Sequence, residues 1–286
     1  MINWFLHRKT LNTISGTIDS KDIHNSEKVL FALFTRYGDT VIDLVVIREF
    51  IQKYPNKDYL ILCPKQMEPY VNELIPDICC VSLNKRNFFH MYRVIQMLKS
   101  WKPDIGFNPW SNGLDSCYFL TFCKHYHCYK DFQKPRIVNH YQVVRKYLGL
   151  PESKWEITQT KFNEEVIQNI LICPQSTDTK RSISDSELNI LIQDLKQFNP
   201  VKITIASMSV EYHRDEFESF LFKKNKLSSL GFLKLVKEAN LVVSCDSGPL
   251  HIALALEKPV WAYFNSTRPE IVLNSRAKVK TIIFKH

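Results

Sequence analysis

The sequence predicts an α/β protein made of two doubly wound parallel-sheet domains. Residues 241–264 run without interruption through an apolar, β-branched strand, a turn with helix-capping residues, a short helix and a second strand. Residues 28–63 show the same order, with a glycine-containing turn between the first strand and an amphipathic helix. Since ligands of such folds bind where the carboxyl ends of the strands meet the helices, we expect one binding edge in each domain.

Length and composition fit this prediction. The 286 residues suffice for two ordinary domains, and 45% hydrophobic with 23% charged residues excludes a disordered or collagen-like chain. The chain has 38 Lys and Arg against 29 Asp and Glu, a net charge of +9, which indicates an acidic partner. No basic and aromatic module typical of nucleic-acid binding is recognisable, so a membrane surface or a phosphorylated substrate is expected instead of nucleic acid.

The sequence predicts a cytoplasmic protein. No apolar run approaches the length of a membrane span, and in the opening MINWFLHRKT the apolar patch precedes the charges, unlike a signal peptide. Most cysteines lie in apolar, strand-like runs, which fits reduced and buried thiols. The segment CKHYHC at 123–128 has metal-type ligands but no second Cys or His pair, so no metal is expected there.

The first domain is expected over residues 28–155, preceded by a basic N-terminal arm over residues 1–27. The arm carries Trp4, Phe5 and Leu6 beside two cations, which fits either a membrane-touching amphipathic helix or a helix packed on the domain. A strand at 28–35, a turn at 36–40 and a helix at 41–54 place Asp39 at the crevice, either as a functional carboxylate or as a plain helix N-cap.

Further elements of this domain follow the same pattern. Strands are predicted at 59–63, 79–83 and 103–107, and helices at 88–101 and 140–149. The loop after the 103–107 strand contains Trp110 and Asn112 and is either part of an acceptor site or only a turn. Asp43, one helical turn beyond Asp39, is the second candidate carboxylate.

The second domain is expected over residues 156–286, with strands at 169–173 and 201–206. Between them, Ser184 and Glu187 form a capping box for a helix at 184–198. The loop at 174–181 offers hydroxyls and adjacent cations, which suit a diphosphate clamp or are merely solvated surface charges. The residues of this loop singled out are Ser176, Thr177, Lys180 and Arg181.

The turn at 246–248 leads into a helix with Pro249 in its first turn. A helix N-terminus at the end of a buried strand presents unpaired N–H groups and the positive end of the helix dipole, which attract phosphate. Gly248 allows close approach of a ligand, Ser247 adds a hydroxyl, and His251 lies one turn further on. An ordinary capped helix with a surface histidine is the alternative.

The segment DSGPLHIALALEKPVWAYF, preceded by SSLGFLKLVKEANLVVSC, resembles the C-terminal donor-binding signature of the bacterial heptosyltransferase family, and the Gly-Asp at 38–39 resembles its N-terminal signature. The resemblance implies a GT-B fold with two Rossmann-like domains facing a central cleft. It also implies an inverting, metal-independent glycosyltransferase without a cofactor. The enzyme would move a sugar, heptose by family default, from a nucleotide-diphosphate donor to a hydroxyl of a lipopolysaccharide or another surface glycan.

The resemblance also implies roles for particular residues. Asp39 is the catalytic base, with Arg36, Trp110 and Asn112 on the acceptor side. The donor-binding residues are Ser176, Thr177, Lys180, Arg181, Glu211, Asp246, Ser247, Gly248 and His251. The expected partners are the nucleotide sugar and an anionic glycolipid or oligosaccharide, with peripheral contact to the cytoplasmic face of the inner membrane.

Two departures from the family pattern limit these implications. Ser182 and Ile183 stand where the family has an aromatic residue, and residues 265–269 replace a Gly-Pro-Thr-Asp-Pro segment, so donor identity stays open. A sugar-nucleotide epimerase of similar fold and a non-catalytic nucleotide-sugar-binding module are the alternative functions.

Overall fold

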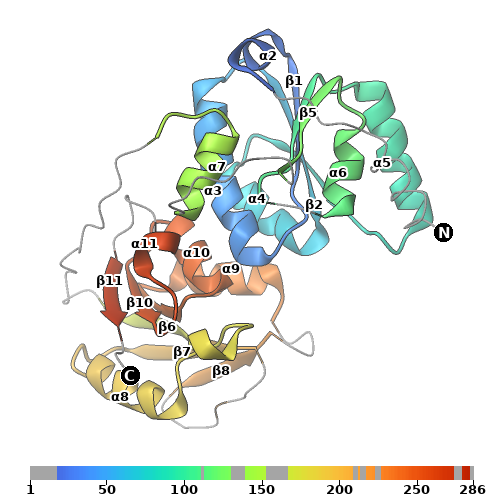
Figure 1. Cartoon of the computed structure of the whole chain (residues 1–286). Coiled ribbons are helices and arrows are strands. Elements are labelled where there is room, and N and C mark those ends of the chain that lie inside the picture. The colour runs from blue at the N-terminus through green and yellow to red at the C-terminus, as the bar shows by residue number, and fades with distance from the viewer. Residues whose placement is uncertain are drawn as a thin grey trace. The chain divides into compact units, whose positions relative to one another are not determined.

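The computed structural model describes residues 18–110, 113–129, 139–152, 167–208, 212, 217–222, 227–273 and 279–283 (Figure 1). Contacts between Cα atoms divide the chain into two compact units, residues 1–153 and 154–286, which we call unit one and unit two. The described residues of each unit form one sheet, and every strand pairing in either sheet is parallel. Each is described by itself.

Unit one has a five-stranded sheet of order β3-β2-β1-β4-β5. The strands are β1 (Lys28–Ala32), β2 (Asp58–Pro64), β3 (Cys79–Leu83), β4 (Ile105–Phe107) and β5 (His125–His127). The central β1 is almost wholly apolar, as expected for a strand covered on both faces. Its register pairs Phe31 with Ile61 of β2 and with Phe107 of β4.

Helices cover both faces of this sheet (Figure 1). They are α2 (Ser20–Asn25), α3 (Tyr37–Lys53), α4 (Glu68–Leu74), α5 (Phe88–Trp101), α6 (Leu114–Leu120) and α7 (His140–Tyr147), with a 3₁₀ turn at Lys65–Met67. On one face, the buried side of α5 packs with α6 against Leu30 and Leu60. On the other face, Phe31 meets Phe50 of α3 edge to face at 5.8 Å, and Phe107 meets Tyr147 of α7 at 6.0 Å.

The described part of the N-terminal arm contains the packed helix α2. Asp19 caps it in a capping box, and Ile23 is buried. The ammonium of Lys57 donates to the carbonyls of His24 at 3.2 Å and Ser26 at 2.5 Å, which ties the end of α2 to the sheet. The patch that contains Trp4, Phe5 and Leu6 lies outside the described residues.

Unit two has a six-stranded sheet of order β11-β10-β9-β6-β7-β8. The strands are β6 (Asn169–Cys173), β7 (Lys202–Ser207), β8 (Glu218–Leu221), β9 (Leu241–Cys245), β10 (Val260–Phe264) and β11 (Val279–Ile283). The helices are α8 (Asp185–Lys196), α9 (Ser229–Glu238), α10 (Gly248–Ala255) and α11 (Pro269–Val272), with a 3₁₀ turn at Thr179–Arg181. Figure 1 shows α8 on one side of this sheet and α9 and α10 on the other.

Several elements differ from the sequence-based expectation. Helix α3 begins at Tyr37, four residues earlier than predicted, so Asp39 lies inside its first turn. The short helices α4, α6 and α11 and the strands β5, β8 and β11 were not predicted. The helices α4, α6 and α11 have seven residues or fewer, about two turns at most, which is too short to display a clear helical period. The capping box of Ser184 and Glu187 at the start of α8 is confirmed.

Candidate functional site

In unit two, the turn from β9 into α10 leaves the helix N-terminus uncapped by any described side chain. Ser247 occupies the N-cap position with an extended backbone, but its hydroxyl donates to the Cys245 carbonyl at 3.2 Å instead of accepting from a helix N–H. The hydroxyl also lies 3.3 Å from that of Ser244. Serine at this position normally caps through its own oxygen, and Ser247 holds the N-cap position without making that hydrogen bond. The Ser247 side chain therefore does not occupy the positive end of the α10 dipole, which can interact with another group.

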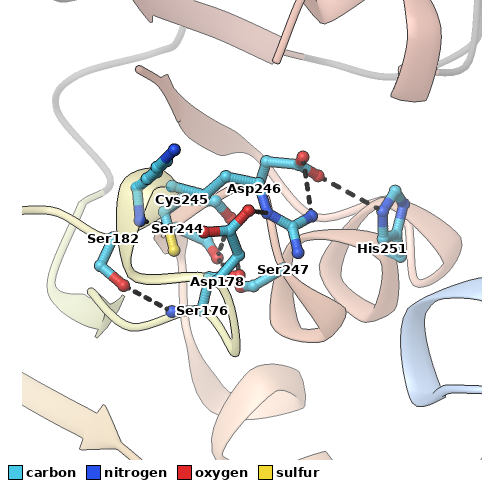
Figure 2. A network of polar contacts seen from close by, with 10 residues as sticks. Ser176, Asp178, Ser182, Ser244, Cys245, Asp246, Ser247 and His251 are labelled. Atoms are coloured by element: carbon cyan, nitrogen blue, oxygen red, sulfur yellow. Dashed lines mark hydrogen bonds and ion pairs between the residues drawn. The ribbon is translucent and has the colours of Figure 1, made fainter. Parts of the chain in front are cut away.

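A buried carboxylate lies directly before this helix. Asp246 is 3% exposed, and its Oδ2 is 3.1 Å from Nη1 of Arg181, a hydrogen-bonded ion pair between the turn and the 174–181 loop. Its Oδ1 is 3.9 Å from Nε2 of His251, which is too long for a hydrogen bond; the contact becomes an ion pair only when the imidazole is protonated. Figure 2 shows Asp246 between the loop and the His251 imidazole. His251 is buried, so the alternative of an ordinary capped helix with a surface histidine is wrong.

The loop that follows β6 forms the other wall of this site. Asp178 caps the 3₁₀ turn by accepting from the Lys180 N–H at 3.2 Å, and the backbone N–H of Ser176 donates to Ser182 Oγ at 3.0 Å. Ser176 is buried, and its hydroxyl has no hydrogen-bond partner among the described residues. Thr177 and Lys180 are exposed.

Neighbouring strands bring these segments together. β6 and β9 are paired, with Cys173 opposite Ser244, so the segments that follow them leave the same edge of the sheet. The amide of Asn265, after β10, donates to the Ser182 carbonyl at 2.9 Å and ties a third segment to this edge. Residues 265–269 depart from the family pattern, but Asn265 at their start makes this hydrogen bond to the segment that follows β6. Glu211 lies outside the described residues.

The corresponding edge of unit one carries Asp39. Arg36 is the N-cap of α3, and Asp39 is the third helical residue, half-buried, with its Oδ2 3.5 Å from the Thr35 hydroxyl. The alternative that Asp39 is the plain N-cap is therefore wrong. A carboxylate in the first helical turn is stabilised by the helix dipole.

Asp43, the second candidate carboxylate, is sealed inside unit one. It is 0% exposed, and neither of its carboxylate oxygens has a hydrogen-bond partner among the described residues. Burial, and secondarily the charge of Asp39, raises the pKa of Asp43 well above its ordinary value. Asp39, which is half-buried, is therefore the more exposed carboxylate of the two.

The loop after β4 is organised by Asn108, a residue that sequence reasoning missed. Asn108 is 0% exposed, and its Oδ1 accepts from the backbone N–H of Tyr129 at 2.7 Å and from the Tyr147 hydroxyl at 3.1 Å. Trp110 has a positive φ of 50° and packs its ring 4.3 Å from His140 and 5.5 Å from Tyr129. An amide directly after a strand was the available signal for Asn108. Asn112 lies outside the described residues.

The CKHYHC segment forms β5 and its flanks, with Cys123 and Cys128 buried in the core of unit one. Burial raises the pKa of Cys123, as expected for a thiol inside a core. In the part of the chain that the structure describes, no three or more His, Cys, Asp and Glu side chains are grouped to hold a metal ion. Nor does any helix there combine the length and apolar character needed to cross a bilayer.

Comparison with known proteins places these features in a family. The model of glycosyltransferase family 9 (heptosyltransferase) matches residues 112–284. Among solved structures, ADP-heptose lps heptosyltransferase II of E. coli is similar, with a TM-score of 0.66 and 14% identity over 89% of this chain and 90% of that chain. A family 9 glycosyl transferase from Veillonella parvula gives a TM-score of 0.66 and 13% identity over 96% and 90% of the two chains.

The E. coli heptosyltransferase WaaC, solved with ADP, gives a TM-score of 0.60 and 13% identity over 88% of this chain and 92% of that chain. No curated protein sequence matches the chain. The structural likeness shows the GT-B fold, and the family model covers more than half of the sequence. The chain therefore belongs to glycosyltransferase family 9, the heptosyltransferase family, and is a glycosyltransferase.

Proposed function

We propose that this glycosyltransferase moves a sugar from a nucleotide-diphosphate donor to a hydroxyl of a lipopolysaccharide or another surface glycan, with inversion and without a metal. The observation that carries the proposal is the N-terminus of α10, where Ser247 makes no side-chain capping bond, beside the ion pair of the buried Asp246 with the partly exposed Arg181. Such a helix end stabilises a bound diphosphate through its N–H groups and its dipole.

The donor diphosphate would lie between α10 and the 174–181 loop. The Ser247 hydroxyl and the backbone at Gly248 face the phosphates in this proposal, and the exposed Lys180 supplies a cation. The buried hydroxyl of Ser176 is a further donor without a described partner. As the bond to the sugar breaks, negative charge grows on the diphosphate, and these groups stabilise it without reorganising.

Asp246 and His251 would orient the donor sugar. Arg181 is already paired with Asp246, so its role in this proposal is to hold that carboxylate in place more than to neutralise phosphate. Glu211, one of the donor-binding residues that the family resemblance implies, is proposed to hold the ribose of the nucleotide. WaaC has been solved with ADP and with ADP-2-deoxy-2-fluoro heptose, which makes ADP-heptose the first donor to test.

Asp39 would act as the general base. The oxygen of the acceptor hydroxyl forms a bond to the anomeric carbon while the bond from that carbon to the diphosphate oxygen breaks. The hydroxyl proton passes to the Asp39 carboxylate, and the nucleoside diphosphate leaves with the electron pair. One displacement of this kind inverts the configuration at the anomeric carbon. Arg36 and Trp110 are the described residues proposed for the acceptor side.

A thermal-shift screen with ADP-, UDP-, GDP- and CMP-linked sugars tests donor binding. A donor at about 100 times its dissociation constant stabilises the folded protein by about 2.7 kcal/mol, which is a readily measured rise in Tm. Asp39→Asn is expected to keep this shift and to lose turnover, whereas Asp58→Asn, an exposed carboxylate at the opposite edge of the same sheet, keeps both. Unchanged turnover in Asp39→Asn, or no shift with any nucleotide sugar, contradicts the proposal.

A further inference from the structure

The first turns of α5 expose three aromatic side chains to solvent. Phe88 is 63% exposed, Phe89 is 76% exposed and Tyr92 is 55% exposed. Residues three and four apart on a helix lie on one side, so Tyr92 continues the surface formed by the two phenylalanines, whose rings meet edge to face at 6.0 Å. The opposite side of α5 is buried in the core, so these aromatic rings are not needed to hold the helix in place.

Exposed cations flank the aromatic rings. Residues 84–93 contain Lys85, Arg86 and Arg93, all exposed, and no carboxylate. Lys85 pairs with Asp115. Among the described residues, neither Arg86 nor Arg93 has a carboxylate within ion-pair distance. We call Lys85, Arg86, Phe88, Phe89, Tyr92 and Arg93 the α5 patch.

The α5 patch lies at the same edge of the unit-one sheet as Asp39. It begins directly after β3, and Asp39 follows β1 by a few residues, with β2 between these two parallel strands. Two further exposed cations mark this edge, Arg36 after β1 and Lys65 after β2. The segments that follow three adjacent strands therefore all present positive charge at the carboxyl edge.

We propose that the α5 patch docks unit one onto the surface of an anionic phospholipid bilayer. Aromatic side chains insert at the level of the lipid headgroups, and Lys and Arg beside them attract anionic lipids. The patch offers both at one end of α5, and the guanidinium groups of Arg86 and Arg93, which have no carboxylate partner among the described residues, complement a surface of continuous negative charge. Large exposed aromatic groups are otherwise unfavourable in water and mark interaction sites.

Docking through this edge would bring the Asp39 side of the sheet to an acceptor held in the membrane. The proposal thus deepens the proposed function, because it names an anionic phospholipid bilayer as the surface at which the enzyme binds its acceptor. The bilayer contact itself depends only on the α5 patch and not on the donor site, so the two can fail separately.

Co-sedimentation of the full chain with vesicles tests the contact. We expect binding to vesicles of phosphatidylcholine with phosphatidylglycerol, weakening with added salt, and little binding to phosphatidylcholine alone. Phe88→Ser/Phe89→Ser should lower the partition coefficient at least about tenfold, since both rings leave the interface. Arg86→Ala/Arg93→Ala should lower it about 25-fold, since each cation near an anionic surface contributes about a factor of five.

The chain offers matched controls away from the patch. Ile190 and Leu230 are exposed apolar residues of unit two, 57% and 65% exposed, so Ile190→Ser/Leu230→Ser removes similar surface elsewhere. Lys21→Ala/Lys99→Ala removes two exposed cations of unit one that lie outside the patch. Both controls should bind vesicles like the wild type. Every variant should keep the wild-type Tm because all the altered side chains are exposed.

Three results would overturn the proposal. One is wild-type protein that binds neither kind of vesicle, and another is patch variants that bind as well as the controls. The third is a wild-type dimer by light scattering that the patch variants convert to monomer without any vesicle binding, which would assign the patch to a second copy of the chain. A donor-induced rise in Tm that persists in these cases would leave the proposed function standing.

Discussion

The ion pair between Arg181 and Asp246 predicts that removing the cation lowers the free energy of unfolding much more than removing the carboxylate. The side chain of Asp246 is 4% exposed, whereas that of Arg181 is 25% exposed. Arg181→Met leaves a carboxylate that water cannot reach. Because unpairing a buried charge costs about 3–5 kcal/mol, we expect the free energy of unfolding to fall by about 3 kcal/mol, near the lower end of that range. Asp246→Asn leaves a cation that water can reach, and we expect a loss of only about 1 kcal/mol.

Urea unfolding of the full chain, with the transition of unit two followed separately, measures both losses. The double variant should be less destabilised than the sum of the two single variants, because the stranded carboxylate is then absent. Lys180→Met, the exposed neighbour, is the matched control and should change the free energy of unfolding by less than about 0.5 kcal/mol. Equal losses for the two single variants, or a larger loss for Asp246→Asn, would refute the reasoning from burial.

Three further substitutions in unit one have expected outcomes that urea unfolding can check. Asp43→Leu replaces two unpartnered oxygens by methyl groups and should stabilise the protein by about 1–3 kcal/mol. Burial raises the pKa of Asp43 in the folded protein, so the unfolded chain releases this proton more readily and the wild type loses stability as the pH rises. The stabilisation by Asp43→Leu should therefore be larger at about pH 8 than at about pH 4. The reverse order would contradict a raised pKa for Asp43. Gly106→Ala would place its Cβ 2.5 Å from Cys123 Sγ and 2.8 Å from Leu120 Cδ2, so a loss of about 1–3 kcal/mol is expected, and a neutral effect would argue against this packing. Asn108→Ala removes the side-chain acceptor of the Tyr129 backbone N–H and one of the acceptors of the Tyr147 hydroxyl, which also contacts the His127 carbonyl, so a loss of about 1–3 kcal/mol is expected. A loss below about 0.5 kcal/mol would speak against its organising role.

Long apolar segments with regular periods are where sequence reasoning succeeded. The β9, α10 and β10 run was predicted to within a few residues, because a buried strand, a proline in the first helical turn and a core-facing stripe all agree there. The start of α3 was missed because Arg36 occupies its N-cap without a side-chain hydrogen bond, so the sequence carries no capping signal at that point.

Contacts between residues far apart in the chain could not be predicted from the sequence. Arg181 and Asp246 are separated by 65 positions, and Asn108 and Tyr147 by 39. Residue spacing predicts which side chains are neighbours on one helix or strand. It therefore places Asp246 beside a helix but cannot predict that Arg181 pairs with it. The same limit explains why His251 was assigned to the surface as one alternative, whereas folding buries it beside Asp246.

The uncapped end of α10 is the feature on which the proposed donor site depends most, and Ser247→Asp tests it. An aspartate is a good N-cap and suits the positive end of the helix dipole, so the fold should stay within about 1 kcal/mol of wild-type stability. The same carboxylate would repel a diphosphate from the position proposed for it. Calorimetric titration with the nucleotide that gives the largest thermal shift should show a dissociation constant at least about 100-fold weaker in Ser247→Asp than in the wild type. Equal affinity in the two proteins would contradict the placement of the diphosphate at α10.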